Sequence, residues 1–339
     1  MVGALVVESD GEIVGRGAYE RAGAEHAETR ALREAGARSR GASLYITLEP
    51  CSHTSPARHA SCADQVASAG IARVVAAMED PDPRVRGTGF AQLRTAGVEV
   101  TVGTLAQDAA RLNRFYVHHR TTGTPFVTLK MAQSLDGAIV SHRGVRRQLT
   151  GPRAATHTRA ARYEHDAVMV GVGTVIVDDP LLTVRPHKAR GVPYTRIVVD
   201  AVGRVPLGAK MLKEQRRART IVATTEQMPQ TTRDALAKRG VSIVVCAQDG
   251  NDRVNLHDLL TRLGREGITS ILCEGGPILG ASLLAGGHVR AVDWLVAPLL
   301  LGGPDAVPVI ADITRDIPLH LERVRRLGDD VLITGEVSR

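Results

Sequence analysis

The sequence predicts two α/β domains joined by a short linker. The chain has 339 residues, which exceeds the roughly 100–200 residues that usually form one domain. Strand-like and helix-like segments alternate at short spacing up to about residue 120, and a second alternating series follows. The turn-forming cluster TTGTP separates the two series. We therefore predict a first domain over residues 1–120 and a second over residues 121–339.

The first domain alternates from its beginning. Its strand-like segments are rich in Val, Ile and Leu, and they are ALVVES, SLYITLEP, ARVVAAMED and VEVTVG. Its helix-like segments are AEHAETRALREAGA, CADQVASAG, GFAQLRTAG and, before the linker, TLAQDAARLNRFYVHHR. Helices between strands at this spacing predict a mixed or parallel sheet that is covered on both faces.

The second domain repeats this organisation on a larger scale. Seven segments are strand candidates: FVTLKMAQSLDG, DAVMVGVGTV, RIVVDA, TIVATT, VSIVVC, SILCEGG and VDWLVAPLLLGG. Helix-like segments lie between several of them, and they are GPRAATHTRAARYE, TTRDALAKRG and LHDLLTRLGREG. The pattern predicts a second α/β domain.

Composition narrows the classes of function. Aromatic residues make up only 3% of the chain, so a platform that stacks single-stranded bases is not expected, and we predict no nucleic-acid partner. No apolar run approaches the roughly 18–20 residues that span a bilayer, and Met1 is followed by no basic leader or cleavage site. We therefore expect a soluble, unexported protein without membrane contact.

Charge and cysteine content indicate the compartment and the type of ligand. The net charge of +7 comes largely from arginines scattered over the chain, which is typical of a solvated surface or of pockets for phosphorylated small molecules. Four cysteines in so long a chain do not form a disulfide framework. Cys246 and Cys273 lie in apolar runs typical of buried strands. We therefore expect a reducing cytoplasm.

Four residues of the first domain have the spacing of a catalytic metal site. His26 and Glu28 lie at the start of a predicted helix, and Cys51 directly follows a predicted strand. Cys62 opens the next predicted helix, where the helix dipole favours a thiolate. One His and two Cys supply three ligands for Zn²⁺ and leave a fourth position open, as a catalytic site requires. The order H-x-E followed by two cysteines is typical of zinc nucleobase deaminases, in which the Glu transfers protons. His53 and His59 are alternative ligands.

Several long motifs resemble the bifunctional riboflavin-biosynthesis deaminase/reductase family. In the first domain they are HAETRALREAG, SLYITLEPCSH and ARVVAAMEDPDPRVRGTGFAQLRTAG. Beyond the linker they are LKMAQSLDGAI, GVGTVIVDDPLLTVR, RIVVDA and LCEGGPILGASLLAGG. The resemblance covers nearly the whole chain.

The resemblance implies a two-step enzyme. Its first domain would be a cytidine-deaminase-like three-layer domain that hydrolyses the 2-amino group of 2,5-diamino-6-(5-phosphoribosylamino)pyrimidin-4-one. Its second would be a dihydrofolate-reductase-like α/β domain that uses NADPH to reduce the ribosyl group to a ribityl group. By resemblance, Glu28 is the proton shuttle, and the zinc ligands are His26, Cys51 and Cys62.

The resemblance also implies the residues of the reductase pocket. Residues that match positions lining NADPH are Ala132, Thr174, Asp178, Gly276, Pro277, Ile278, Leu279, Gly280, Ala281 and Ser282. Residues that match substrate contacts are Arg162, Leu182, Arg185 and Glu274. Arginine forks suit a phosphate, and backbone amides at a helix start suit a pyrophosphate. Lys130 and Asp136 are further pocket candidates, although a Lys at a strand edge and an Asp-Gly turn are also ordinary.

Two segments of this half have alternative readings. Asp178-Asp179-Pro180 is also typical of a turn that ends a strand. The glycine run is also typical of a simple turn, and VGVGT lacks the fuller dinucleotide fingerprint, so no Rossmann domain is expected.

The chain departs from the family pattern in both halves. Met1 leads directly into Val2-Gly3, where the family has a helix and an Asn-Pro turn, and the loop TSPARHAS separates the zinc cysteines by more residues than is usual. In the reductase half, Gln148 replaces an aromatic beside the cofactor and Arg146 replaces a substrate-contacting serine. Near the adenosine phosphate Ala201 replaces a serine, and Arg204 is available for a 2′-phosphate.

These departures leave other functions open. One is a paralogue that applies the same chemistry to another aminopyrimidine, and another is a form with impaired deaminase that acts mainly as a reductase. A third is a catalytically weakened partner that binds nucleotide. We expect reduction to survive the departures and deamination to be the impaired activity. We also expect a phosphoribosylated aminopyrimidine substrate and a homo-oligomer, a dimer or a tetramer.

Overall fold

The computed structural model divides the chain into two compact units. It describes residues 2–19, 23–53, 60–143, 147–184, 194–213, 215–311 and 313–338. Unit 1 is Met1–Thr122 and unit 2 is Gly123–Arg339. Among the described residues, no helix combines the length and the apolar character that crossing a membrane requires.

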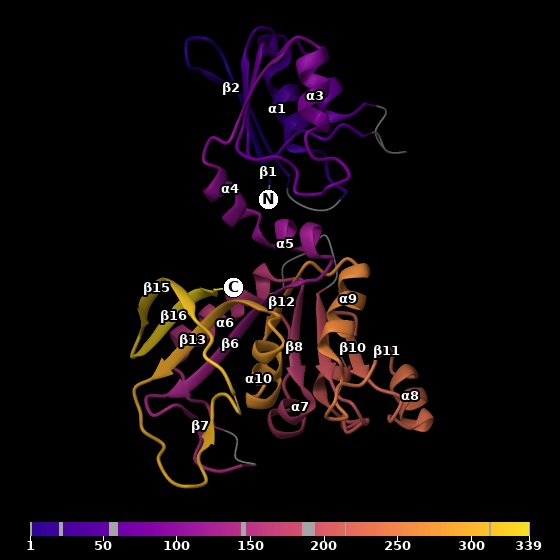
Figure 1. Ribbon diagram of the computed structural model, residues 1–339, viewed down its shortest axis with the longest axis vertical. Helices are drawn as coiled ribbons and strands as arrows, with labels where there is room; N and C mark the ends of the chain where they lie inside the picture. Colours follow the sequence, from indigo (N-terminus) through magenta and orange to yellow (C-terminus); the bar gives the residue numbers. More distant parts are fainter. Residues whose placement is uncertain are drawn as a thin grey trace. The chain divides into compact units, whose positions relative to one another are not determined.

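Unit 1 is built on a five-stranded sheet with the order β2-β1-β3-β4-β5 (Figure 1). The strands are β1 (Val2–Val7), β2 (Ile13–Tyr19), β3 (Ser43–Ile46), β4 (Arg73–Ala76) and β5 (Glu99–Val102). β1 is antiparallel to β2 and β3, whereas β3, β4 and β5 are parallel. β2 was not predicted, although Asp10-Gly11 between apolar segments is a hairpin signal and Gly11 has a φ of 91°.

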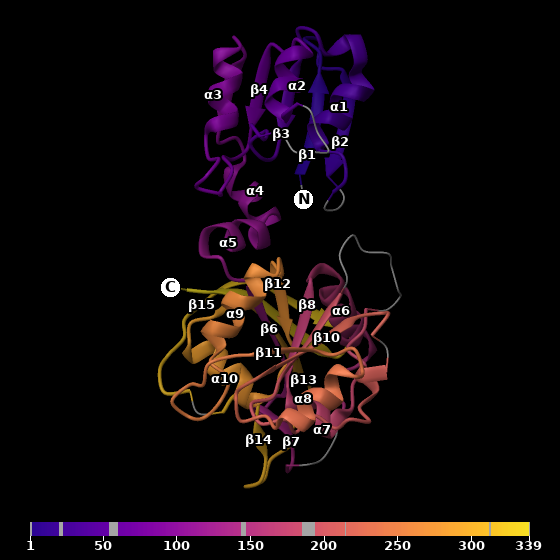
Figure 2. The same cartoon turned by 90° about the vertical axis from the view of Figure 1, so that its right-hand side faces the viewer.

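Three helices cover one face of this sheet. They are α1 (Ala27–Ala35), α2 (Cys62–Ser68) and α3 (Thr88–Thr95), and Figure 2 shows them side by side. Alternate strand residues such as Leu44 and Val74 are fully buried beneath them. On the opposite face Leu5 is 37% and Tyr45 is 41% exposed. We predicted that both faces of this sheet are covered, but the face with Leu5 and Tyr45 is only partly covered.

Close packing of α1 on β2 depends on two glycines. A Cβ at Gly15 would lie 2.1 Å from the carbonyl oxygen of Ala31, and one at Gly17 would lie 1.8 Å from that of Ala27. The absence of side chains thus lets the helix backbone contact the strand directly. This contact fixes the N-terminal turn of α1, which carries His26 and Glu28.

The segment before unit 2 forms two helices where the sequence predicted one. They are α4 (Ala106–Leu112) and α5 (Arg114–Thr122), separated at buried Asn113. A short 3-10 helix, η1 (Gly36–Ser39), extends α1. The Tyr116 hydroxyl of α5 donates to Asp80 at 3.1 Å. Because α5 includes Thr121 and Thr122, only the last three residues of the predicted linker connect the units.

Unit 2 is built on a nine-stranded sheet with the order β11-β10-β9-β8-β12-β6-β13-β16-β15 (Figure 1). Each of the seven predicted segments contains a strand, and these strands are β6 (Phe126–Ser134), β8 (Ala167–Gly171), β9 (Thr195–Val199), β10 (Arg219–Thr224), β11 (Ser242–Val245), β12 (Ser270–Cys273) and β13 (Val289–Ala297). These seven run parallel to one another. Their carboxyl ends therefore lie at the same edge of the sheet.

Four further strands were not predicted. β15 (Leu319–Leu327) and β16 (Asp330–Val337) form an antiparallel hairpin that pairs with β13. β7 (Ala138–Val140) and β14 (Val307–Pro308) form a separate two-stranded sheet.

Helices cover both faces of the parallel part of the sheet. They are α6 (Pro152–Glu164), α7 (Val172–Asp178), α8 (Gln230–Ala237), α9 (Leu256–Arg265) and α10 (Pro277–Ala285), with η2 (Lys210–Lys213) as a short 3-10 helix. Ile197 and Ile221 pack on one face in a core that includes Leu259 of α9. Val198 packs on the other face in a core that includes Leu236 of α8. The α/β fold class predicted for this half is therefore confirmed.

We had predicted one continuous strand for the segment DAVMVGVGTV, but the structure has a strand followed by a helix there. β8 ends at Gly171 and α7 begins at Val172. The prediction failed because Val, Thr and Ile dominate both elements, so β-propensity did not mark the boundary. Asp178 is thus the last residue of a helix, and Asp179 caps that helix with a left-handed φ of 41°.

We predict that Gly17→Ala destabilises unit 1. Its methyl group would overlap the Ala27 carbonyl oxygen, and overpacking of this kind costs about 1–3 kcal/mol in the free energy of unfolding. Gly3→Ala is the matched control in the same sheet, because no atom lies within 4 Å of the added Cβ. Urea denaturation of both variants measures the difference, and equal midpoints would contradict the close contact between α1 and β2.

Candidate active sites

Three potential metal ligands converge in unit 1. His26 is the N-cap of α1, Cys62 is the first residue of α2, and Cys51 lies in the loop after β3. The His26 Nδ1 atom lies 3.1 Å from the Cys62 Sγ atom and 3.8 Å from the Cys51 Sγ atom. One ligand atom from each residue fits within a mutual distance of 4.8 Å. One nitrogen and two sulfur donors suit Zn²⁺, so these residues fit that ion.

Buried Glu49 holds the loop that carries Cys51. Its carboxylate accepts the backbone N–H groups of Asp80 at 3.0 Å, Gly87 at 2.9 Å and Gly89 at 2.8 Å. A Cβ at Gly89 would lie 2.0 Å from the carbonyl oxygen of Pro50, so glycine permits the approach. We had predicted that Cys51 directly follows the strand. β3 ends at Ile46, however, and Cys51 lies on this braced loop.

The N-terminus of α2 favours a thiolate at this site. The backbone N–H of Cys62 donates to the Cys51 Sγ atom at 3.5 Å, and that of Ala63 donates to the Cys51 carbonyl at 3.1 Å. Hydrogen bonding from the Cys62 thiol lowers the pKa of Cys51 to about 3. The hydrogen bond to Cys51, together with burial, raises the pKa of the Cys62 thiol. Ser61 and Asp64 form a capping box that fixes this end of α2.

Glu28 lies beside the three ligands without belonging to their cluster. It occupies the first turn of α1, and only 3% of the residue is exposed. Burial raises the pKa of its carboxyl. A buried carboxyl group next to a metal site is suited to accept and return a proton. His53 is not part of the cluster found among the described residues, and His59 lies outside the described residues.

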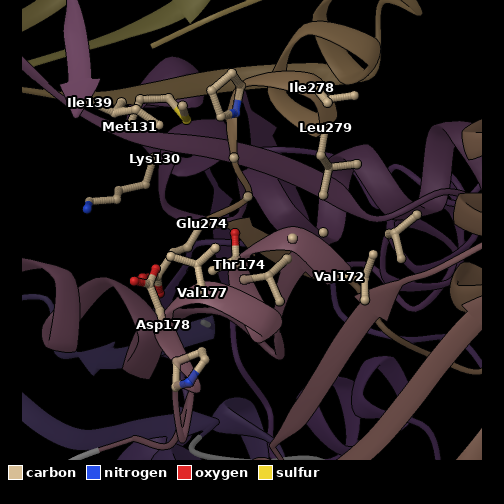
Figure 3. A pocket seen from close by; sticks show the side chains of 18 of the residues that line it. Lys130, Met131, Ile139, Val172, Thr174, Val177, Asp178, Glu274, Ile278 and Leu279 are labelled. Carbon is tan, nitrogen blue, oxygen red and sulfur yellow. The ribbon is translucent and has the colours of Figure 1, made fainter. Parts of the chain in front are cut away.

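A second site is a cavity of about 1220 Å³ in unit 2. Its walls come from segments at or just after the carboxyl ends of β6, β8, β9 and β12 and from the start of α9. Figure 3 shows Lys130, Asp178 and Glu274 on one part of its wall and Ile278 and Leu279 on another. The carboxyl edge of a parallel sheet is where such folds usually bind ligands.

The cavity brings together most of the pocket residues that the sequence predicted. Those that line it are Ala132, Gln148, Arg162, Thr174, Asp178, Leu182, Glu274, Gly276, Pro277, Ile278, Leu279 and Ser282. Gly280 and Ala281 do not line it, because they are buried on the core side of α10. A Cβ at Gly280 would lie 3.0 Å from Ile310. Arg146 and Arg185 lie outside the described residues.

The two additional pocket candidates have different positions. Lys130 lines the cavity, and burial lowers the pKa of its ammonium group. Asp136 does not line it. The Asp136 carboxylate accepts the backbone N–H of Gly302 at 2.7 Å, and hydrogen bonding from Ser134 lowers the pKa of Asp136 to about 2. Asp136 therefore connects two loops.

Arg162 and Glu274 form a bidentate ion pair in the cavity wall. The Nε and Nη2 atoms of Arg162 donate to the two carboxylate oxygens of Glu274 at 2.5 and 2.8 Å. Burial opposes ionisation of Glu274, but the charge and hydrogen bonds of Arg162 hold its pKa below the usual value. The guanidinium fork that we assigned to a substrate phosphate is thus directed at a protein carboxylate.

The N-terminus of α10 forms a backbone cradle in the cavity. Gly276 is the N-cap and Pro277 the first helical residue, so the following N–H groups have no partner within the helix. A Cβ at Gly275 would lie 2.7 Å from the Leu279 side chain, so the absence of a side chain lets Leu279 pack against the turn before α10. Free N–H groups at a helix start suit the pyrophosphate of a dinucleotide such as NADPH.

Sequence reasoning missed several basic residues of this cavity. Arg143, Arg147, Arg159 and Arg253 line it in addition to Arg162 and Arg204. Arg253 belongs to the segment DGNDR, which the sequence marks only as a turn. An excess of arginines in one cavity favours phosphorylated ligands.

Comparisons with known proteins match both units. Residues 1–78 match the cytidine and deoxycytidylate deaminase zinc-binding region, and residues 125–333 match the RibD C-terminal domain. Riboflavin biosynthesis protein RibD of Actinobacillus pleuropneumoniae is 37% identical over 98% of this chain and 88% of that protein. The RibD protein of Escherichia coli K12 is 35% identical over 98% of this chain and 92% of that protein.

Solved structures agree with the sequence matches. Form 1 of Acinetobacter baumannii RibD has a TM-score of 0.89 and 33% identity, and the match covers 100% of this chain and 92% of that one. A diaminohydroxyphosphoribosylaminopyrimidine deaminase/5-amino-6-(5-phosphoribosylamino)uracil reductase from Thermotoga maritima has a TM-score of 0.84 and 29% identity, over 99% and 92% of the two chains. The chain therefore belongs to the RibD family and is a bifunctional deaminase and reductase of riboflavin biosynthesis, with a zinc-binding deaminase domain and an NADPH-dependent reductase domain.

Proposed function

We propose that unit 1 deaminates 2,5-diamino-6-(5-phosphoribosylamino)pyrimidin-4-one and that unit 2 reduces the ribosyl group of the product to ribityl. The convergence of His26, Cys51 and Cys62 beside buried Glu28 carries the first half of this proposal. The arginine-lined cavity with its helix N-terminus supports the second half. The printed activities of the Thermotoga maritima protein agree with both steps.

In the deaminase site each residue has a distinct role. His26, Cys51 and Cys62 hold the zinc ion, which when bound supplies the Lewis acidity that makes water a nucleophile at neutral pH. The water oxygen bonds to the ring carbon that bears the 2-amino group, and the bond to nitrogen breaks to release ammonia. Glu28 takes a proton from the attacking water and delivers it to the departing amine. Its burial keeps that carboxyl away from competing solvent.

In the reductase site the protein positions charge around a hydride transfer. NADPH, when bound, supplies the hydride that reduces the sugar carbon. The Arg162–Glu274 pair fixes the carboxylate in the wall, and Lys130 adds a positive charge to the same cavity. The lining arginines that are described, such as Arg143 and Arg159, are suited to the substrate phosphate.

Two of the departures that motivate the alternative functions lie in residues that the structure does not describe, whereas Gln148 lines the cavity. The longer cysteine loop lies largely in residues 54–59, and Arg146 lies in residues 144–146. No described feature favours a different aminopyrimidine or a non-catalytic partner over the proposed reactions.

Two further expectations belong to this proposal. β15 lies at the edge of its sheet, and Leu319, Leu321 and Val324 on it are 41%, 55% and 61% exposed. Exposed apolar side chains on an edge strand are suited to contact with another copy, which supports a homo-oligomer, a dimer or a tetramer. All four cysteines are free, which supports a reducing cytoplasm as the compartment.

We predict about one zinc ion per chain in the wild-type protein and a clear loss of zinc in Cys62→Ser. Serine cannot supply the thiolate that one of three ligand positions requires. Cys246→Ser is the matched control, because Cys246 is a buried free cysteine in unit 2. Metal analysis of the purified proteins measures the ratio. Equal zinc in Cys62→Ser and wild type would remove Cys62 from the ligand set.

We predict that Glu28→Gln lowers ammonia release by about 100-fold or more while zinc content and NADPH oxidation remain normal. Glutamine cannot exchange the proton, and general acid–base groups contribute roughly 10²–10⁴-fold. Glu34→Gln on the same helix is the control, because Glu34 accepts the backbone N–H of Arg16 and glutamine retains an acceptor. A normal rate of deamination in Glu28→Gln would overturn the assigned role.

We predict the converse result for Glu274→Gln. The substitution leaves Arg162 with an uncompensated charge in the cavity wall, so NADPH oxidation with the deaminated substrate should fall by about 100-fold. Ammonia release should not change, because Glu274 lies in the other unit. Glu266→Gln is the matched control, since Glu266 pairs with Arg219 at the surface. Unchanged reduction in a folded Glu274→Gln protein would contradict the proposed reductase site.

A further inference from the structure

The cavity of unit 2 extends across several neighbouring strands. Lys130 lies in the middle of β6, Glu274 directly follows β12, and α10 begins three residues after Glu274. The lining then continues past β8 to Arg204 after β9 and to Arg253 before α9. The strand order β11-β10-β9-β8-β12-β6 therefore places these two arginines at the opposite end of the cavity from Lys130. A cavity that spans this many strands can hold an extended dinucleotide.

Arg204 projects from a turn that a buried carboxylate holds in place. Asp200 is 1% exposed, and its two oxygens accept the backbone N–H groups of Gly203 at 3.2 Å and Val205 at 2.8 Å. Gly203 has a φ of 84°, and a Cβ there would lie 2.9 Å from the side chain of Met228. The backbone on both sides of Arg204 is thus fixed.

Arg253 projects from a second turn of the same construction. The Asp249 carboxylate accepts the backbone N–H groups of Asn251 at 2.8 Å and Arg253 at 2.9 Å. The Asp249 N–H in turn donates to the Arg253 carbonyl at 2.8 Å. Val254 and Leu256, which follow the turn, are buried in the main core of unit 2. Arg253 therefore has a fixed backbone at the rim of the cavity.

The two guanidinium groups are available to a ligand. Among the residues that the structure describes, neither the Arg204 nor the Arg253 side chain has a hydrogen bond or an ion pair. Their turns follow β9 and β11, which flank β10. Strands β9 and β11 are two strand spacings apart, which is about 10 Å. Two arginine side chains can reach across this distance to contact one phosphate group. Asp249 also lines the cavity, and its Oδ1 atom is directed at the N–H groups of Asn251 and Arg253.

We propose that Arg253, together with Arg204, binds the 2′-phosphate of the adenosine half of NADPH and makes the enzyme select NADPH over NADH. This inference rests on the proposed reductase function, because it places the nicotinamide near Lys130 and Glu274 and the pyrophosphate at the start of α10. Arg253 is then a specificity-determining residue on the turn between β11 and α9. Guanidinium groups form charge-assisted hydrogen bonds with a phosphate, which a ribose 2′-hydroxyl cannot replace.

Stacking of Arg253 on the adenine ring is the competing role for the same position. A stacking arginine would contribute equally to ligands with and without the 2′-phosphate. A phosphate-binding arginine would contribute only to ligands that carry it. The two roles therefore differ in how affinity depends on a single phosphate group.

Calorimetry with adenosine 2′,5′-bisphosphate and with 5′-AMP separates these roles without relying on turnover. The variants are Arg253→Gln, Arg253→Lys and Arg204→Gln, with Arg265→Gln as control, because Arg265 is exposed and does not line the cavity. We expect Arg253→Gln to weaken binding of the bisphosphate by about 10–100-fold and to change binding of 5′-AMP by less than about threefold. Arg253→Lys should retain part of the preference, since it keeps the charge without the fork.

Steady-state reduction with NADPH and with NADH completes the test. The wild-type ratio of kcat/KM for the two cofactors should favour NADPH, and Arg253→Gln should reduce that ratio by about 10-fold or more. An unchanged ratio, or an equal loss of both adenosine ligands, would overturn the role of Arg253. Absence of any NADPH oxidation by the wild-type enzyme would instead contradict the proposed function. Thermal unfolding of each variant distinguishes these results from misfolding.

Discussion

Carboxylates that accept backbone N–H groups hold the loops on which both sites are built. Parallel strands are buried in the interior of an α/β unit, so the loops at their carboxyl ends contain N–H groups that no strand can pair. Glu49 satisfies three such groups in unit 1, and Asp200 and Asp249 satisfy two each in unit 2. Because each unpaired buried group costs about 1–3 kcal/mol, Glu49 and Asp200 determine the conformations of their loops, and Asp249 holds an exposed turn.

The same constraint explains where the reactive side chains lie. In unit 1, His26 and Cys62 occupy the N-terminal ends of α1 and α2, and the loop braced by Glu49 brings Cys51 to them. Close packing of glycine residues on β2 sets the position of α1 itself. In unit 2 the N-terminus of α10 likewise lines the cavity, with Gly276 as its N-cap and Pro277 as its first residue. Both sites thus combine helix starts with loops of fixed backbone.

The predictions were right where a local pattern was recognised, and they were wrong where a local signal was overlooked or where a distant contact decides the structure. The H-x-E motif with two cysteines and the seven strands of unit 2 are local patterns, and the structure brings the predicted ligands together. The β1–β2 hairpin was missed although Asp10-Gly11 marks it locally. Helix α7 resembles a strand in composition, and only its tertiary position shows otherwise. Gly280 belongs to the predicted glycine run, but helical periodicity turns it toward the core.

The arginines of unit 2 show why a residue type alone does not define a role. Arg162 and Arg253 both line the cavity, and the sequence makes either a candidate for binding phosphate. Arg162 pairs with Glu274, which lies 112 positions away in the chain. No local sequence pattern predicts that ion pair. Its charge is therefore compensated within the protein, and it shapes the wall. Arg253 has no such partner among the described residues. An uncompensated guanidinium on a fixed turn can exchange water for a phosphate at low conformational cost, which is the physical basis for assigning cofactor selection to Arg253.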